Sequence, residues 1–183
     1  MSRRFHLRCW TRFLAPLEQV WQHKTTPETL LDEFRPWLSL EAEDPDAAQR
    51  LLRGENLPGV VQTRLKLLGV LPTGQWPLRL EALELHRRYL DTSENTLYAT
   101  WHHEHLFEPT ADGVRYIDAL TFTPREGLPP KWIARLTTRL FVHRHRRAAR
   151  RLPSDSRATA VAMLRELPEA SDFRPSAATS EHD

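Results

Sequence analysis

The 183-residue sequence has very little cysteine and no long apolar run, and each absence excludes a class of structure. Cys9 is the only cysteine, so the chain has no intramolecular disulfide framework and no zinc site built from several thiolates. A reducing compartment fits this cysteine usage. No stretch approaches 18 consecutive apolar residues, and Arg8 and Arg12 interrupt the segment where the apolar part of a secretory signal would lie. We therefore expect a cytoplasmic protein.

Lysine is also scarce. Only three of the 26 basic residues are lysine, and this bias toward arginine is typical of a GC-rich bacterial genome. The net charge of +2 conceals an uneven distribution, because residues 131–151 contain eight basic residues and no acidic one. The remaining residues contain 18 basic and 24 acidic side chains, a net charge of −6. The question of a charged partner therefore concerns this segment and not the whole chain.

The first third of the sequence predicts one strand and two or three short helices. Residues 5–13 alternate between apolar and polar side chains, as a half-buried strand does. A short amphipathic helix is expected to begin at Pro16, and a second at Pro27 with Thr26 as its N-cap. Residues 38–59 are less regular, with a small helix expected within 44–54.

The middle of the sequence predicts antiparallel strands, and the last third a long helix. Alternating patterns predict strands at 61–67, 76–82, 87–92, 96–107 and 114–123, with a turn at 71–74. From 129 to about 152 the apolar residues recur every three or four positions without glycine, so we expect an amphipathic helix of about 20 residues. Residues 1–152 are thus expected to form one domain. Residues 153–183 read as a polar, disordered tail with a short helix at 157–167.

This order of elements predicts an α+β fold in which a curved antiparallel sheet wraps around the long helix. The segment 97–107 is the most informative strand, because alternation places His103 and His105 on its more apolar, inward face. If residues 108–113 form the connection, a hairpin that pairs Phe107 with Val114 also pairs His105 with Tyr116. The same register places His103 opposite Asp118.

Three interpretations of these histidines remain open. They can be polar groups that satisfy one another and the head group of a ligand. They can be metal ligands together with Asp118, although no third histidine or cysteine stands at a telling spacing, and we predict no metal and no cofactor. One of them can be a general acid or base that Asp118 orients.

Several short motifs resemble the START-like (SRPBCC) superfamily. Ala15-Pro16 followed by Val20-Trp21 is similar to the start of that fold, and Pro27-Glu28-x-Leu30 with Arg35-Pro36 to its second helix. The segment Trp101-x-His103-x-His105-x-Phe107, followed by Asp118 and Pro124, resembles a pattern of its bacterial ligand-binding members, and Phe141-x-x-Arg144 resembles their last helix. The resemblance covers residues 4–152. It implies the helix-grip fold and a hydrophobic cavity between sheet and helix, used for lipids, quinones or polyketides.

The function expected first is non-catalytic binding of a small hydrophobic or amphipathic ligand in that cavity. The residues expected to bind it are apolar wall residues and a few polar ones that orient the ligand: Trp76, Leu78, Trp101, His103, His105, Phe107, Tyr116, Asp118, Phe122, Trp132, Leu136 and Leu140. The structural alternative is a filled core without a cavity.

Two other functions compete with this one. A cyclase or dehydratase would use His103 or His105 with Asp118, but the sequence supplies no nucleophile and no glycine-rich phosphate loop. An anionic membrane surface is a further candidate partner, through residues 139–151 and five arginines: Arg144, Arg146, Arg147, Arg150 and Arg151. The alternative is that these arginines form a solvated face, balanced by the acidic remainder of the chain. We expect no specific nucleic-acid partner, because no aromatic residues interleave with these arginines on the exposed side of the helix. The sequence does not determine the oligomeric state.

Overall fold

The computed structural model describes residues 3–155 and 161–168. They form an antiparallel sheet with four helices, which confirms the α+β helix-grip prediction. The strands are β1 (Arg4–Phe13), β2 (Leu38–Ala42), β3 (Gly59–Leu67), β4 (Leu71–Glu84), β5 (Arg88–Ser93), β6 (Tyr98–Thr110), β7 (Gly113–Pro124) and β8 (Val161–Leu167). The helices are α1 (Leu17–Thr25), α2 (Pro27–Asp32), α3 (Pro45–Leu52) and α4 (Pro130–Ala148). No helix among the described residues is long and apolar enough to cross a membrane.

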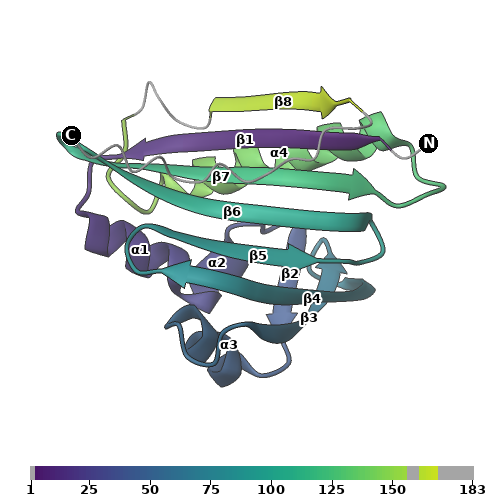
Figure 1. The fold of residues 1–183 in the computed structure, drawn as a ribbon, viewed down its shortest axis with the longest axis horizontal. Coiled ribbons are helices and arrows are strands. Elements are labelled where there is room, and N and C mark those ends of the chain that lie inside the picture. Colours follow the sequence, from purple (N-terminus) through teal and green to yellow (C-terminus); the bar gives the residue numbers. More distant parts are fainter. Residues whose placement is uncertain (1–2, 156–160, 169–183) are drawn as a thin grey trace.

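The strands of the sheet follow the order β2-β3-β4-β5-β6-β7-β1-β8. Strands β2 to β7 lie side by side in chain order. The first strand of the chain, β1, pairs with the free side of β7. Helix α4 packs against β1, β7 and β8, while α1, α2 and α3 lie toward the other strands (Figure 1). The sheet therefore has one long helix along part of its inner face and three short helices over the remainder.

The buried sides of β1 and α4 follow from their sequences. In β1 every second side chain from Phe5 to Phe13 is buried, as the alternation predicted. Helix α4 begins at Pro130 with Pro129 as its N-cap, positions where a missing amide proton costs no helical hydrogen bond. Its buried stripe runs from Ile133 through Leu140 and Phe141, and continues at its C-terminal end with Arg144 and His145. A charged residue is unusual in a buried stripe, because arginine is seldom fully buried unless other side chains pair with it.

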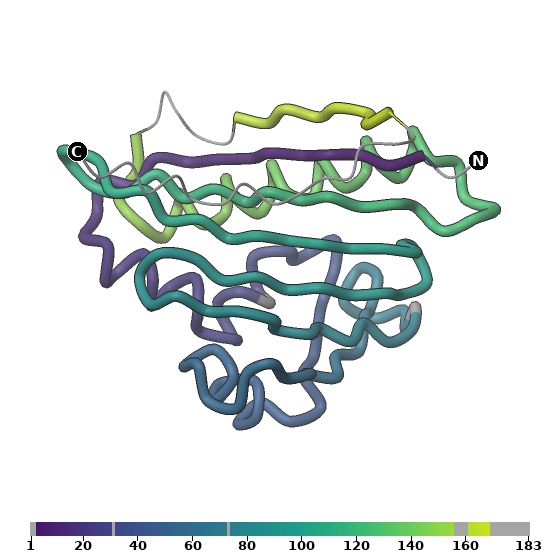
Figure 2. Tube along the Cα trace, in the orientation of Figure 1, coloured from purple at the N-terminus to yellow at the C-terminus, as the bar shows by residue number. Residues whose placement is uncertain are grey.

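The segment 161–167 is a strand, which corrects the prediction of a helix there. Strand β8 pairs along β1 with Leu7 opposite Leu164, and Figure 2 shows these two ends of the chain side by side. Without β8, β1 would be an edge strand with unpaired backbone groups, and pairing overrides the weak helical preference of this segment. The sheet therefore extends beyond the expected boundary at residue 152. Residues 156–160 and 169–183 of the expected tail lie outside the described residues.

Two other expectations need correction. Residues 38–42, expected to be irregular, form β2 and pair with β3. The turn expected at residues 71–74 lies earlier, at residues 68–70, so that β4 already begins at Leu71. Helix α3 forms where it was expected, and the carboxylate of Asp44 accepts a hydrogen bond from the Ala47 amide as its N-cap. The long helix ends at Ala148, about one turn before the expected end.

The register between β6 and β7 differs by two residues from the expected one. Phe107 lies opposite Tyr116, and His105 lies opposite Asp118. The shift arises because β6 continues to Thr110, and only residues 111 and 112 form the turn. A shift of two residues preserves the face of every side chain, so both histidines still point inward.

Candidate functional site

A cavity of about 110 Å³ lies between the sheet and α4, and residues of α2, β2 and α3 line its remaining side. Its wall is almost wholly apolar, with aromatic side chains from β4 and β6 facing aliphatic ones from the helices. Apart from two tyrosines, the polar side chains in the wall come from β3, β5, β6 and α4: Thr63, Asp91, His103, His105, Thr137 and Arg144. Trp76 also lines the cavity, and its buried indole N–H has no hydrogen-bond partner among the described residues.

The structure brings six of the twelve expected binding residues to the cavity wall: Trp76, Leu78, Trp101, His103, His105 and Leu140. The aromatic rings form a continuous group, since the centroids of Trp76 and Trp101 are 5.3 Å apart in an edge-on arrangement. Phe141, which the sequence comparison used only as a motif residue, also lines the cavity. This placement fits the alternation of β4 and β6 on which the expectation rested.

The other six do not line the cavity. Phe107 packs against Trp21 in a second apolar cluster, and Phe122 stacks against Phe5. Leu136 is partly buried against the core, whereas Trp132 is 59% exposed. Trp132 lies off the buried stripe of α4, which begins one residue later at Ile133. The remaining two, Tyr116 and Asp118, are fully buried in the polar cluster around the histidines.

The rings of His103 and His105 lie against each other, tilted by 39°, between two carboxylates. Their ring centroids are 3.7 Å apart. On one side, Asp91 Oδ2 lies 3.2 Å from His103 Nδ1 and 3.0 Å from His105 Nε2. On the other side, Asp118 Oδ1 lies 3.0 Å from His103 Nε2 and 3.2 Å from His105 Nδ1. The diagonal contact of His103 with Asp118 forms despite the changed register, because both side chains lie on the same face of the sheet.

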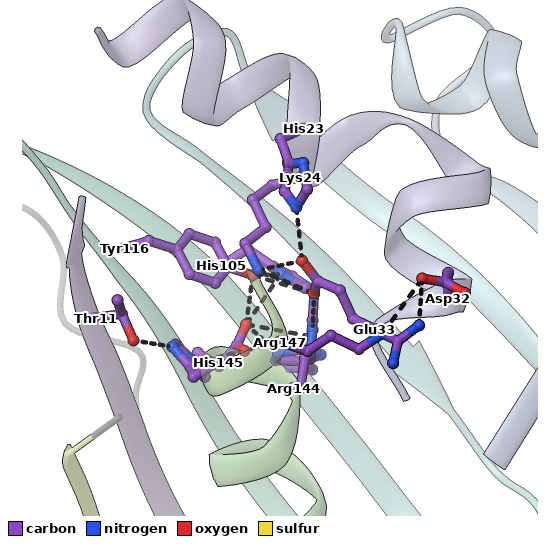
Figure 3. A network of polar contacts seen from close by, with 12 residues as sticks. Thr11, His23, Lys24, Asp32, Glu33, His105, Tyr116, Arg144, His145 and Arg147 are labelled. Carbon is purple, nitrogen blue, oxygen red and sulfur yellow. Dashed lines mark hydrogen bonds and ion pairs between the residues drawn. The ribbon is translucent and has the colours of Figure 1, made fainter. Parts of the chain in front are cut away.

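Asp118 connects this pair to a buried polar network, of which Figure 3 labels Tyr116, Arg144 and His145. Its Oδ2 lies 2.9 Å from His145 Nε2 and 3.3 Å from Arg144 Nη1, and the Tyr116 hydroxyl donates to its Oδ1 at 2.6 Å. Arg144 also donates to Glu33 at 2.8 Å. Buried charges are tolerated when they are paired and hydrogen-bonded in this way.

A further basic group, from the C-terminal end of α1, belongs to the same network. Lys24 donates to both carboxylate oxygens of Glu33, at 2.7 and 2.9 Å, and both side chains are fully buried. His23 lies 3.1 Å from the same carboxylate. One glutamate thus receives two cationic side chains from elements that are far apart in the sequence.

The network shifts the pKa values of its members. Burial alone would raise the pKa of Asp118, but Arg144 and His103 hold it well below its usual range. Burial is likewise outweighed at Glu33, where Lys24 and Arg144 lower the pKa. The pKa of His103 is raised, because Asp91 and Asp118 outweigh its burial, whereas burial and the neighbouring His103 lower the pKa of His105. The carboxylates are therefore ionised. Of the two imidazoles, His103 has the higher pKa and is the more basic.

Four important residues were missed from sequence. Asp91 shares the inward face of β5 with Tyr89, and this alternation was the available signal. Tyr98 reaches the cavity wall because the register shifts between Tyr98 and Thr100, which simple alternation does not anticipate. Lys24 and Glu33 gave no local signal, because their partner Arg144 lies 111 residues from Glu33.

Only part of the arginine-rich end of α4 forms the exposed patch that was expected. Arg144 is buried inside the network just described. Arg147 and Arg151 both contact Asp32, with Arg147 Nη2 3.0 Å from the carboxylate, so a residue of α2 offsets part of the charge. Arg146, Arg150 and Arg151 are exposed. The correction has a simple cause: the helix turns residue 144 onto the buried stripe and residue 146 away from it.

Solved structures share this architecture. A protein from Chromobacterium violaceum is similar with a TM-score of 0.64 at 15% identity, over 82% of this chain and 98% of the other. A START superfamily protein from Mycobacterium smegmatis gives 0.58 at 11% identity, over 80% and 97%. An AHSA1-like protein from Aeromonas hydrophila gives 0.55 at 10% identity, over 80% and 93%. The fold is START-like, as the sequence motifs predicted.

The sequence profile of one protein family matches residues 11–152, and that family is described as a domain of unknown function, DUF8410. The chain belongs to this family. No curated protein matches the sequence.

Proposed function

We propose that the chain binds a small, largely apolar molecule with a polar end in the cavity between the sheet and α4. The observation that carries this proposal is the apolar cavity whose wall contains a few polar groups, among them Asp91, His103 and His105. Binding sites for small molecules commonly combine an apolar wall with a few convergent polar groups that fix the orientation of the ligand. The unpaired indole N–H of Trp76 adds a donor for an acceptor atom of the ligand.

The cavity volume limits the size of the ligand. An apolar cavity of about 150 Å³ is known to hold benzene, so a volume of about 110 Å³ suits a single ring or a short chain. A ligand with several rings or a long acyl chain would extend beyond this volume. Among the lipid, quinone and polyketide-like classes, the volume therefore favours small, ring-containing molecules.

Ligand-observed NMR with single-ring compounds tests this proposal. Indole and benzoate are mixed with the full chain, and magnetisation transfer from protein to compound reports binding. Ala48 lines the cavity and its neighbour Ala47 does not, so Ala48→Phe should abolish the signal while Ala47→Phe, the matched control on the same helix, should preserve it. Binding that is absent in the natural chain, or equal in both variants, would contradict the proposal.

An acid–base enzyme is the second candidate, and the contact of His103 with Asp118 favours it. A histidine at a cavity wall with a carboxylate 3.0 Å behind its Nε2 has the geometry of an oriented general acid or base. Molecules extracted from the purified chain can be incubated with fresh protein and followed by NMR. A compound that is converted, and is not converted by His103→Gln, supports the enzyme; an unchanged compound supports binding alone.

A further inference from the structure

His103 and His105 together make more nitrogen-to-carboxylate contacts than two neutral imidazoles have protons. The two rings make four contacts of 3.0–3.2 Å with carboxylate oxygens, two with Asp91 and two with Asp118. Ionised carboxylates only accept hydrogen bonds, and two neutral imidazoles carry two N–H groups between them. Two of the four contacts therefore hold no proton unless the rings are themselves positively charged.

The hydrogen bonds around Tyr116 indicate which contacts hold the protons. Its hydroxyl donates to Asp118, so its oxygen is free to accept from His105 Nδ1, which lies 2.6 Å away. A proton on His105 Nδ1 leaves Nε2 with a lone pair directed at Asp91 Oδ2, 3.0 Å away. Asp118 likewise receives His103 Nε2, which leaves His103 Nδ1 facing Asp91 at 3.2 Å.

We infer that Asp91, His103 and His105 bind one divalent transition-metal ion through Asp91 Oδ2, His103 Nδ1 and His105 Nε2. Each of the three residues offers one ligand atom, and these atoms lie within 4.8 Å of one another. With bonds of about 2.1 Å, neighbouring ligand atoms stand about 3.0 Å apart in an octahedron and about 3.4 Å apart in a tetrahedron. The observed nitrogen-to-oxygen distances of 3.0 and 3.2 Å already match such separations.

Asp118 occupies the place of an outer carboxylate in this arrangement. Histidines that bind metals usually donate their second N–H to a carboxylate or carbonyl, which fixes the tautomer and the orientation of the ring. Asp118 Oδ1 faces the second nitrogen of both rings, and Arg144 and His145 in turn hold Asp118. Asp91 is therefore the carboxylate ligand, and Asp118 orients the two imidazoles. From the sequence alone, Asp118 was the candidate carboxylate ligand.

The location leaves coordination positions for another molecule. Asp91, His103 and His105 all line the cavity and are almost fully buried, at 8%, 4% and 2% exposed. Two histidines and one carboxylate with positions open to a cavity are the donor set of many zinc and non-haem iron sites. Water or the polar end of a cavity ligand would complete the coordination.

The charges of the buried network suit a divalent ion with an anionic partner. Glu33, Asp91 and Asp118 contribute three negative charges, and Lys24 and Arg144 two positive ones. With neutral histidines the network therefore has a net charge of −1. A divalent ion changes this to +1, which a bound hydroxide or a carboxylate of the ligand would neutralise.

The test is a titration of the metal-free full chain with Co²⁺ and Zn²⁺. After treatment with a chelator and dialysis, Co²⁺ should bind at one equivalent and give visible absorption bands of a nitrogen- and oxygen-coordinated ion, and Zn²⁺ should remove them. Calorimetry with Zn²⁺ alone should give the same stoichiometry. A natural chain that binds neither ion at a defined stoichiometry overturns the proposal, whatever the variants do.

Four variants locate the site. Asp91→Asn and His103→Gln should abolish the bands, while Asp118→Asn should weaken Co²⁺ binding about 10- to 100-fold, as the loss of an outer carboxylate does. His102→Gln is the matched control, because His102 is the adjacent histidine of β6 on the opposite face. Circular dichroism confirms the fold of each variant. Unchanged binding in correctly folded Asp91→Asn overturns the site; the NMR test of ring binding needs no metal, so the two proposals fail separately.

Discussion

Lys24 and Glu33 form a fully buried ion pair, with Lys24 Nζ 2.7 Å from Glu33 Oε1. Arg144 donates to the other oxygen of the same carboxylate at 2.8 Å. One acidic residue between α2 and β2 thus neutralises cations from α1 and α4, and it joins three helical segments beside the cavity. Removing one partner of such a cluster leaves uncompensated charge in the interior.

We predict that Glu33→Gln lowers the free energy of unfolding by about 3 kcal/mol or more, because Lys24 and Arg144 lose their carboxylate. Urea unfolding measures the change. Glu41→Gln is the matched control, since Glu41 pairs with Lys66 at 2.8 Å on the surface, where solvent screens the interaction. Equal losses in the two variants would show that the buried pair contributes no more than an exposed one.

We predict that stability falls steeply below about pH 4.5, where carboxylates take up protons in the unfolded chain. Burial is outweighed at Glu33, Asp91 and Asp118 by nearby cations and histidines, so each has a lowered pKa in the folded chain. The unfolded state then binds more protons as the pH falls, and each group adds up to about 1.4 kcal/mol per pH unit.

Urea unfolding at pH 7, 5, 4 and 3 measures this slope, and the slope should be smaller in Glu33→Gln than in Glu41→Gln. A free energy of unfolding that is constant from pH 7 to pH 3 would contradict the ionised network. The prediction concerns the acid side alone, because the contribution of these carboxylates is fully present above their ordinary pKa values.

We predict that Cys9 is unreactive in the folded chain. The residue is fully buried in β1, and burial, reinforced by the negative charge of Asp118, raises the pKa of its thiol. The thiolate that reacts with disulfide reagents is therefore both inaccessible and scarce. A chromogenic aromatic disulfide should label one equivalent rapidly in urea and very slowly in buffer; rapid labelling in buffer would show that β1 is open to solvent.

We predict that a chain ending at Asp155 loses protection of β1 amides. Alternate residues of β1 direct their backbone hydrogen bonds to β7 and to β8, so removal of β8 should expose every second amide to hydrogen exchange. A chain ending at Pro168 retains β8 and is the matched control. Identical exchange in the two chains would contradict the pairing of β8 with β1.

The parts of the fold that depend on local pattern could be predicted from sequence. The inward direction of His103 and His105 follows from alternation within one strand, and the capped start of α3 follows from Asp44 and Pro45. The register of β6 and β7 was two residues off, because it depends on where the chain turns. Whether the turn takes residues 108–113 or only 111–112 is a choice that the pattern of either strand leaves open.

The parts of the fold and of the site that depend on distant partners could not be predicted from sequence. Residues 161–167 become a strand because the edge of β1 is available, and their own sequence favours no such pairing. Arg144 resembles its exposed arginine neighbours until Glu33 and Asp118 are known to lie beside it. Among the site residues that sequence reasoning missed, Asp91 alone had a usable local signal, as a carboxylate on the inward face of a strand.

Xenon binding in crystals of the full chain tests the central claim, the apolar cavity between the sheet and α4, most directly. Xenon enters dry apolar cavities of this size and is located by its anomalous scattering. The account predicts one xenon site in contact with Trp76, Trp101 and Leu140 in the natural chain, lost in Ala48→Phe and retained in Ala47→Phe. Crystals of the natural chain that contain no xenon there, with those three side chains packed against one another, would contradict it.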